Sequence, residues 1–274
     1  MEIVSGILIP IFIILGIGAA MALLLTVAAK FFAVEEDQTA VAIRDCLPGA
    51  NCGACGYSGC DGYAKALAEG TETKTNLCVP GGDGAARGVA EALGVAAEDV
   101  VEMVAYVACN GTCDVVDKKF IYDGQQTCHT ANLAYSGDRF CNFACLGYGD
   151  CVRVCPEHAI SIQNGVARVN PKACIGCGIC TRQCPNGIIH LITDVSRVVV
   201  ECSNHDKGAI TRKACKNGCI GCGKCEKTCP NGAIKVVDNL ATIDYSKCTG
   251  CAACVEVCPV HCIHEGNFVC GAHF

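Results

Sequence analysis

Hydrophobic and polar positions divide the chain into one long apolar segment and many short segments bounded by turns. Ile3 to Ala29 are 27 consecutive residues without a charge, between Glu2 and Lys30. As a helix rising about 1.5 Å per residue, this run exceeds a hydrocarbon core of about 30 Å. It predicts a single transmembrane anchor. A cleaved signal peptide would have a basic start, a shorter apolar run and a small-residue cleavage site.

Short apolar segments in the C-terminal half alternate with turn signals. Ala159–Ile162 and Val166–Val169 flank Asn164–Gly165, a sequence that favours a β-hairpin. Ile234–Val237 followed by Asp238–Asn239 repeats the arrangement. The short segments before each Cys-Pro pair fit one-turn helices. Together these signals predict small α+β units.

The Cys-Pro pairs define an internal repeat. They lie at 155–156, 184–185, 229–230 and 258–259, and the distance from Cys155 to Cys174 equals that from Cys229 to Cys248, at 19 positions. Two modules of two units each follow from this spacing. Upstream, the sequence favours a helix at Gly62–Glu69, a turn-rich boundary at Pro80–Gly84, and room for a helix and a strand within 85–107. The expected domains are an anchor at 1–30, a small domain at 31–84, a connecting region at 85–135, and two repeat modules at 136–200 and 201–274.

Composition shows what must hold these domains together. Of 274 residues, 28 are cysteine, Trp is absent, and aromatic residues make up 5 %. A large core of Leu, Phe and Trp is therefore not expected, and disulfides, zinc or iron–sulfur clusters have to stabilise the Cys-rich part.

The strongest motif is Cys-x2-Cys-x2-Cys-x3-Cys-Pro, which begins at Cys174, Cys219 and Cys248. In this bacterial ferredoxin run, three thiolates bind one 4Fe-4S cluster and the fourth binds its neighbour. The expected ligand sets of the second module are Cys219, Cys222, Cys225 with Cys258, and Cys248, Cys251, Cys254 with Cys229. Those of the first module are Cys174, Cys177, Cys180 with Cys155, and Cys141, Cys145, Cys151 with Cys184.

Two further groups lie upstream. Cys52, Cys55, Cys60 and Cys78, beside a glycine-rich turn, predict a fifth cluster close to the membrane. Cys109, Cys113 and Cys128 have three thiols for a sixth cluster, and either Cys202 or Cys215 could supply the fourth. Five clusters are expected and the sixth is left open.

Other chemistries fit the pattern less well. Zinc ribbons use two Cys-x2-Cys pairs rather than repeated triple runs, and disulfides need an oxidised compartment. Cys46, Cys262 and Cys270 are interpreted as small buried residues. No dinucleotide or Walker A motif is present, so the chain is expected to have no active site of its own.

Charge is unevenly distributed over the sequence. Residues 203–235 carry seven bases and two acids, whereas 31–102 carry twelve acids and four bases. The basic segment suits docking of an acidic redox partner; equally, its lysines could offset the charge of reduced clusters. The net charge of -6 argues against nucleic acid as a partner.

The order of these motifs resembles a known family. An apolar N-terminal helix precedes Leu-Pro-Gly-Ala-Asn-Cys-Gly-Ala-Cys-Gly-Tyr-Ser-Gly-Cys at 47–60, then Cys78 with Pro-Gly-Gly, Cys-Asn-Gly-Thr-Cys at 109–113, Cys-Leu-Gly-Tyr-Gly-Asp-Cys at 145–151, and the ferredoxin units. This order is similar to that of the B subunits of Rnf complexes, the ion-translocating ferredoxin:NAD oxidoreductases, and two ferredoxin modules match the longer members.

The resemblance implies an electron-transfer subunit of a translocase. Such a subunit takes electrons from reduced ferredoxin and passes them through its clusters to other Rnf subunits, which reduce NAD and move sodium ions or protons. It implies a single-pass protein of the cytoplasmic (inner) membrane, held in the lipid bilayer, with the clusters on the cytoplasmic side, where thiolates stay reduced. Electrons are expected to enter at the C-terminal modules and leave at the Cys60 cluster. The alternative is a membrane-tethered polyferredoxin that serves another oxidoreductase without ion pumping.

Overall fold

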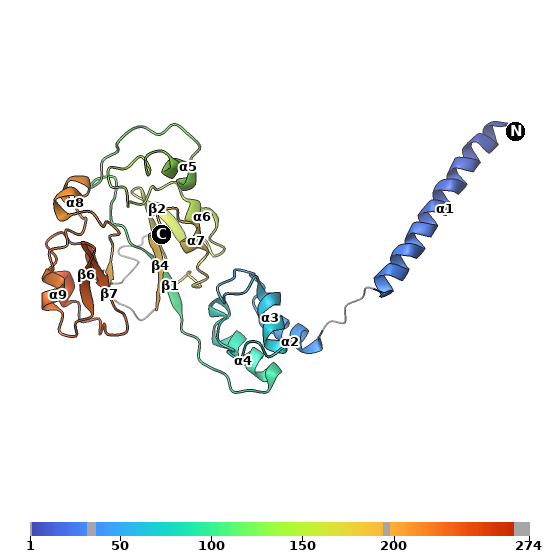
Figure 1. The fold of residues 1–274 in the computed structure, drawn as a ribbon, viewed down its shortest axis with the longest axis horizontal. Helices are drawn as coiled ribbons and strands as arrows, with labels where there is room; N and C mark the ends of the chain where they lie inside the picture. The colour runs from blue at the N-terminus through green and yellow to red at the C-terminus, as the bar shows by residue number, and fades with distance from the viewer. Residues whose placement is uncertain (1, 32–36, 194–197, 266–274) are drawn as a thin grey trace.

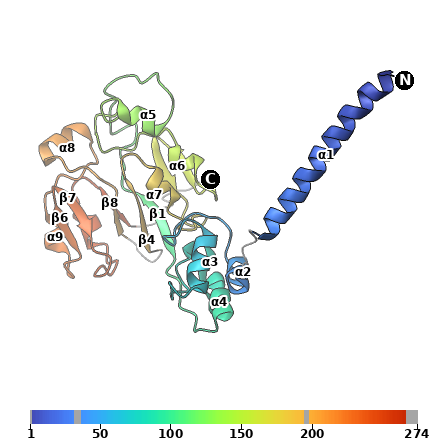
Figure 2. The same cartoon turned by 45° about the vertical axis from the view of Figure 1, so that its right-hand side comes forward.

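The computed structural model describes residues 2–31, 37–193 and 198–265, and in the first helix it describes side chains at 14–28 and 30. Helix α1 (Glu2–Phe31) occupies the segment expected to form the anchor and stands apart from the other elements in both views (Figures 1 and 2). Apolar side chains such as Leu23 are exposed along it. Within the residues searched, none of the helices combines the length and the apolar character needed to cross a membrane.

A small helical domain follows α1. It consists of α2 (Gln38–Cys46), α3 (Cys60–Ala68), the 3-10 turn η1 (Val79–Gly81) and α4 (Gly82–Leu93). Ile43, Tyr63, Leu67 and Val89 form its buried core. The helix expected near Gly62–Glu69 is confirmed as α3. This domain therefore has an apolar core of its own beside its cysteines.

Two β-hairpins form the centres of the ferredoxin-like modules. Strands β2 (Ile160–Gln163) and β3 (Val166–Val169) pair antiparallel, as do β6 (Ile234–Val237) and β7 (Leu240–Ile243). Both turns have positive φ at their two central residues, with 46° and 77° at Asn164 and Gly165. That conformation matches the twist of the flanking strands. The predicted hairpins are confirmed.

Each module is closed by a second strand pair that the hairpin signals do not reveal. Strand β1 (Met103–Val107) pairs antiparallel with β4 (Ile189–Thr193), and β5 (Val198–Val200) pairs with β8 (Ile263–Glu265). The first module thus includes β1 from the expected connecting region, and β5 pairs within the second module rather than the first. The expected boundaries at 136 and 201 lie inside these structural units, because the outer strands pair across long sequence separations.

Six short helices lie in the described part of this region, and five of them carry one cysteine each. They are α5 (Cys128–Leu133), α6 (Asp150–Arg153), α7 (Ile179–Gln183), α8 (Gly208–Ala214), α9 (Lys224–Thr228) and α10 (Ala253–Glu256). The four that precede Cys-Pro pairs are one-turn helices of four or five residues, as predicted. Thiols such as Cys145, Cys151 and Cys180 belong to the first module's buried core together with Val166 and Ile189.

Candidate metal centres

The helical domain brings together the four thiols expected there, Cys52, Cys55, Cys60 and Cys78, here called the N-terminal set. Burial raises the pKa of Cys78, an effect that the Gly81 N–H opposes and the three nearby thiols reinforce. The Asn51 side chain accepts a hydrogen bond from the Cys60 N–H at 2.8 Å and so folds the glycine-rich loop onto the start of α3. A Cβ at Gly81 would lie 3.1 Å from the Cys78 sulfur, so glycine there lets the backbone approach the thiol closely.

The second module contains two cavities that match the two expected sets. Cys219, Cys222, Cys225 and Cys258 line one of them (the Cys219 set). Cys229, Cys248, Cys251 and Cys254 line the other (the Cys248 set). The Ala233 N–H donates to the Cys229 sulfur at 3.3 Å. Donors of this kind stabilise the charge on a metal-bound thiolate.

One set of the first module also assembles as expected. Burial raises the pKa of Cys180 to about 12, and the nearby thiols of Cys174, Cys177 and Cys155 add to that rise. These four residues are the Cys174 set. The Ala159 N–H donates to the Cys155 sulfur at 3.3 Å, which is the counterpart of the contact at Cys229.

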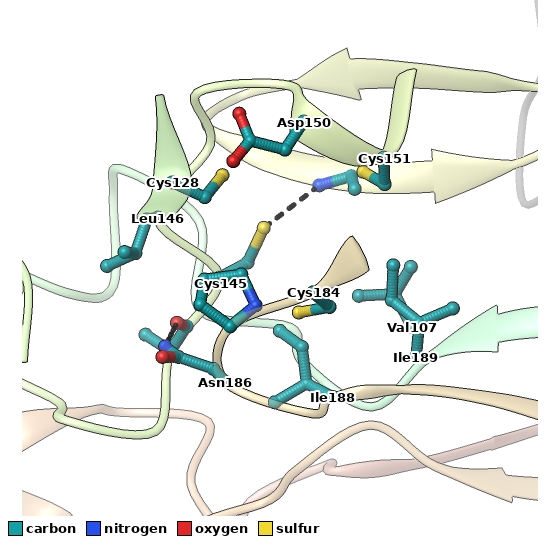
Figure 3. Close-up of a pocket in the computed structure, with 13 residues that line it drawn as sticks. Val107, Cys128, Cys145, Leu146, Asp150, Cys151, Cys184, Asn186, Ile188 and Ile189 are labelled. Atoms are coloured by element: carbon teal, nitrogen blue, oxygen red, sulfur yellow. Dashed lines mark hydrogen bonds between the residues drawn. The ribbon is translucent and has the colours of Figure 1, made fainter. Parts of the chain in front are cut away.

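The other set of the first module has an unexpected member. Cys145, Cys151 and Cys184 line one cavity together with Cys128, and Figure 3 shows these four side chains around a common space (the Cys145 set). The expected Cys141 is not among the residues that line this cavity. The loop from Cys145 to Cys151 lacks the central cysteine of a Cys-x2-Cys-x2-Cys run, and Cys128, at the start of α5, supplies a thiol instead.

The remaining thiols group differently from the expected sixth set. Cys109, Cys141, Cys202 and Cys215 line one further cavity, called the junction set because its members flank both modules. Cys113 is exposed, and its sulfur accepts a hydrogen bond from the buried Arg139 side chain at 3.5 Å. The sequence pattern groups Cys113 and Cys128 with Cys109. In the structure, Cys109 instead shares its cavity with Cys141 and with both candidates for the fourth ligand, Cys202 and Cys215.

The thiols interpreted as structural residues differ from one another. Cys46 is partly buried and donates to the Ala42 carbonyl at 3.3 Å. Cys262 is 1 % exposed, and its sulfur lies 3.7 Å from the Cys258 sulfur. Cys270 lies outside the described residues.

The donor chemistry of these sets fits iron–sulfur clusters. Four cysteine thiols surround each site, and backbone N–H groups point at several of the sulfurs, as in cluster-binding loops. Burial and neighbouring thiols raise the pKa of Cys145 and of Cys151 to about 12. Metal binding requires the thiolate, so bound iron has to supply the positive charge that offsets this penalty. Within the described residues, no group of three or more His, Cys, Asp or Glu is arranged to hold a single metal ion.

Comparison with known families agrees with this chemistry. A model described as an Fe-S cluster family matches residues 47–80, and models described as 4Fe-4S dicluster domains match 140–188, 173–233 and 213–264. The chain is therefore a multi-cluster iron–sulfur protein built from ferredoxin-type modules, and it holds several 4Fe-4S clusters.

Three relatives give the family. The chain is 42 % identical over 94 % of its length to the B subunit of the Na(+)-translocating ferredoxin:NAD(+) oxidoreductase complex of Acetobacterium woodii, covering 78 % of that protein. It is 42 % identical over 85 % of its length to the proton-translocating counterpart of Clostridium ljungdahlii, covering 82 % of it. The B subunit of the ion-translocating oxidoreductase complex of Methanosarcina acetivorans is 37 % identical over 86 % of the chain, with 89 % of that protein covered. The chain belongs to the family of B subunits of ion-translocating ferredoxin:NAD oxidoreductase (Rnf) complexes.

Proposed function

We propose that this chain is the electron-transfer subunit of a membrane-bound, ion-translocating ferredoxin:NAD oxidoreductase. It takes electrons from reduced ferredoxin and relays them through 4Fe-4S clusters to the other subunits. Each bound cluster supplies one-electron transfer, and the chain makes and breaks no substrate bond. The single observation that carries the proposal is the arrangement of separate four-thiol sites from the second module to the helical domain, in a chain of this family.

The proposed ligands are the N-terminal set, the Cys145 set, the Cys174 set, the Cys219 set and the Cys248 set. Cys128 takes the place in the Cys145 set that the sequence pattern gave to Cys141. The N-terminal set is the proposed exit because two contacts link it to the Cys174 set. Cys52 acts electrostatically on Cys177, and the Arg182 side chain donates to the Cys52 carbonyl at 2.5 Å.

Helix α1 is the proposed membrane anchor. The support is the uncharged run from Ile3 to Ala29, its helical conformation, and the exposure of described side chains such as Ile14 and Leu24. We place the cluster domains on the cytoplasmic side, because cluster thiolates need a reducing compartment and Lys30 follows the apolar run. The proposed partners are the membrane subunits of the complex, soluble ferredoxin and the lipid bilayer.

Replacing Cys60 with Ala in the intact complex tests the route. Reduced ferredoxin should still reduce the clusters of both modules, while NAD reduction falls to the background rate. Electron paramagnetic resonance (EPR) of the clusters and NADH absorbance measure the two steps. Cys46→Ala, which removes a thiol outside all the sets in the same domain, is the control and should keep full NAD reduction. Continued NAD reduction by Cys60→Ala would exclude the proposed exit.

A further inference from the structure

The cavity of the Cys219 set is lined by a fifth thiol. Besides the four proposed ligands, Cys262 lies on its wall. The Cys262 sulfur lies 3.7 Å from the Cys258 sulfur, and the thiol is also hydrogen-bonded to Cys219. Only 1 % of Cys262 is exposed, so its thiol faces the cavity and not the solvent. The cavities of the Cys145 set and the Cys248 set are lined by four thiols each.

Cys262 lies at the end of a turn that the chain forms four times. In each Cys-Pro unit, the third residue after the cysteine donates its N–H to the carbonyl of that cysteine, at 3.1–3.3 Å. This third residue has a φ between 48° and 61° in all four units, at His158, Gly187, Gly232 and His261. The four turns therefore share one conformation, and the fourth residue after each cysteine occupies an equivalent position.

At this equivalent position, three units have an aliphatic residue and one has a thiol. All four side chains are at most 3 % exposed, and they belong to Ala159, Ile188, Ala233 and Cys262. Ile188 and Ala233 line the cavities of their own sets, as Cys262 does. An apolar side chain therefore satisfies the packing of this turn. The thiol of Cys262 adds a chemical property that the fold of the turn does not need.

Cys258 and Cys262 are held close enough to bind one iron atom. The Cys262 carbonyl accepts the Glu201 N–H at 2.8 Å, and strand β8 begins at the next residue. The Cys258 N–H donates to the Val255 carbonyl at 3.3 Å. Two thiolates that bind one tetrahedral metal at about 2.3 Å lie about 3.8 Å apart. The 3.7 Å between these two sulfurs is therefore the spacing of two ligands that can reach the same metal atom.

We propose that Cys262 is an alternative iron ligand of the Cys219 set and can take the place of Cys258. The inference rests on the proposed function, because it adds a ligand to one of the proposed clusters. Cys222 of the same set is exposed, so solvent reaches this site. A second thiol beside Cys258 keeps a ligand at that iron when the bond to Cys258 opens.

The exchange of the two ligands conserves atoms and electrons. The bond between Cys258 and iron breaks, and a bond between Cys262 and the same iron forms. The thiol proton of Cys262 passes to the Cys258 sulfur along the contact between them. Nothing is oxidised or reduced, and the number of thiolates bound to the cluster stays at four.

The test compares two Cys-Pro units of the second module in the full complex, purified without oxygen. In Cys258→Ala, Cys262 should bind the iron, so iron and acid-labile sulfide per complex should equal those of wild type. Cys229→Ala is the matched variant, because its unit has Ala233 where the other has Cys262. No thiol can replace Cys229, and about one to four iron atoms per complex should be lost.

Two double variants assign this effect to the thiol at the equivalent position. Cys258→Ala with Cys262→Ala should lose as much iron as Cys229→Ala does. Cys229→Ala with Ala233→Cys should regain iron, because it gives the other unit the same second thiol. Redox titration followed by EPR should show a full set of clusters in Cys258→Ala, with the potential of one cluster shifted by its changed ligand.

A chelator experiment decides the matter if Cys258→Ala fails to fold. Cys262→Ala keeps all the proposed ligands and should contain full iron. Under an anaerobic iron chelator it should lose the iron of one cluster roughly tenfold faster than wild type, because no second thiol holds the iron when the bond to Cys258 opens. Cys46→Ala removes a thiol of the helical domain and should lose iron at the wild-type rate.

The outcomes separate the two proposals. Equal iron loss in Cys258→Ala and in its double variant, full iron in that double variant, or equal chelation rates in Cys262→Ala and wild type would overturn the alternative ligand. Each would leave the relay through the proposed sets intact. A wild-type complex without acid-labile sulfide in this chain would instead overturn the proposed function itself.

Discussion

Cys262 shows how one residue outside the ligand sets can act on a cluster site. Its thiol is buried in the second module against Cys258 and Cys219. Hydrogen bonds to both sulfurs raise the pKa of Cys262, and the same bonds lower the pKa of Cys258 to about 5 and that of Cys219 to about 6. Cys262 is therefore the donor, and the two proposed ligands are the acceptors. A donor to ligand sulfur stabilises the more negative, reduced cluster.

Cys262→Ala should make the potential of the Cys219-set cluster more negative. If the lost donation is worth about 1 kcal/mol more in the reduced state, the shift is on the order of 40 mV for one electron. An EPR-monitored redox titration of the intact chain measures this potential. Cys46→Ala removes a thiol that donates a hydrogen bond to a backbone carbonyl in the helical domain, and it should leave this potential unchanged. Equal potentials in wild type and Cys262→Ala would show that the S–H group does not tune the cluster.

At the scale of elements, the cluster loops are fixed by close packing against the hairpins. Gly147, in the loop of the Cys145 set, has a φ of 78°, and a Cβ there would lie 2.6 Å from the Gly165 carbonyl oxygen in the β2–β3 turn. In the second module, a Cβ at Gly221 would lie 2.9 Å from the carbonyl oxygen of Asn239 in the β6–β7 turn. In both modules a glycine therefore lets the loop contact the turn backbone.

Gly147→Ala should destabilise the first module by roughly 2–4 kcal/mol, because it combines a strained φ with overlap against backbone. Gly149→Ala is the matched control in the same loop: its φ is 79°, but the nearest atoms to the added Cβ lie at 3.8 Å. It should cost only about 1 kcal/mol. Thermal unfolding of the cluster-loaded chain, followed by circular dichroism, compares the two. Equal losses would mean that the contact with the turn is unimportant.

The elements that the sequence predicts are those with local signals. The hairpin turns at Asn164 and Asp238 and the one-turn helices before Cys-Pro depend on a few adjacent residues, and they form where expected. The pairing of β1 with β4 joins segments more than eighty residues apart, and no local pattern specifies it. Position along the chain likewise suggested Cys141 for the Cys145 set, whereas Cys128 reaches that cavity from a separate helix.

The junction set has a signal in the sequence that lies outside the ferredoxin run. The spacing from Cys141 to Cys145 repeats from Cys215 to Cys219. Such a repeat predicts that these cysteines occupy equivalent positions in the two modules. It does not predict that they lie close together, because that depends on how the two modules pack. The set is recognisable only once Cys109 and Cys202 are placed at the ends of equivalent strands.

At the scale of the whole molecule, contacts between the sets define an order. The Cys202 sulfur accepts a hydrogen bond from the Cys219 N–H, and the Cys109 sulfur accepts one from the Cys145 N–H. The thiol of Cys151 lies near that of Cys180, and the thiol of Cys177 lies near that of Cys52. These contacts give a single line from the second module, through the junction set and the first module, to the helical domain that follows α1 in the chain.

The positive charge on the surface of the second module makes this module the expected place where electrons enter the line. All seven bases of residues 203–235 are exposed, among them Lys213, Lys216 and Lys224. Cys222 of the Cys219 set is exposed beside them. An acidic ferredoxin would be attracted to this surface and would meet a cluster close to it.

Reversing the charge of Lys213, Lys216 and Lys224 to Glu should slow reduction by ferredoxin about tenfold to a hundredfold at low salt, because long-range attraction becomes repulsion. The difference should shrink as salt screens the charges. Stopped-flow absorbance of the clusters measures the rate across a salt series. Reversal of Lys65, Lys74 and Arg87, three exposed bases of the helical domain, changes the net charge equally and is the control. If both triple variants slow the reaction equally, net charge alone governs the encounter. If only the Lys213, Lys216 and Lys224 variant is slower, and its cluster potentials match wild type, the basic segment is the docking surface. In that case its lysines do not serve as a counter-charge for the reduced clusters.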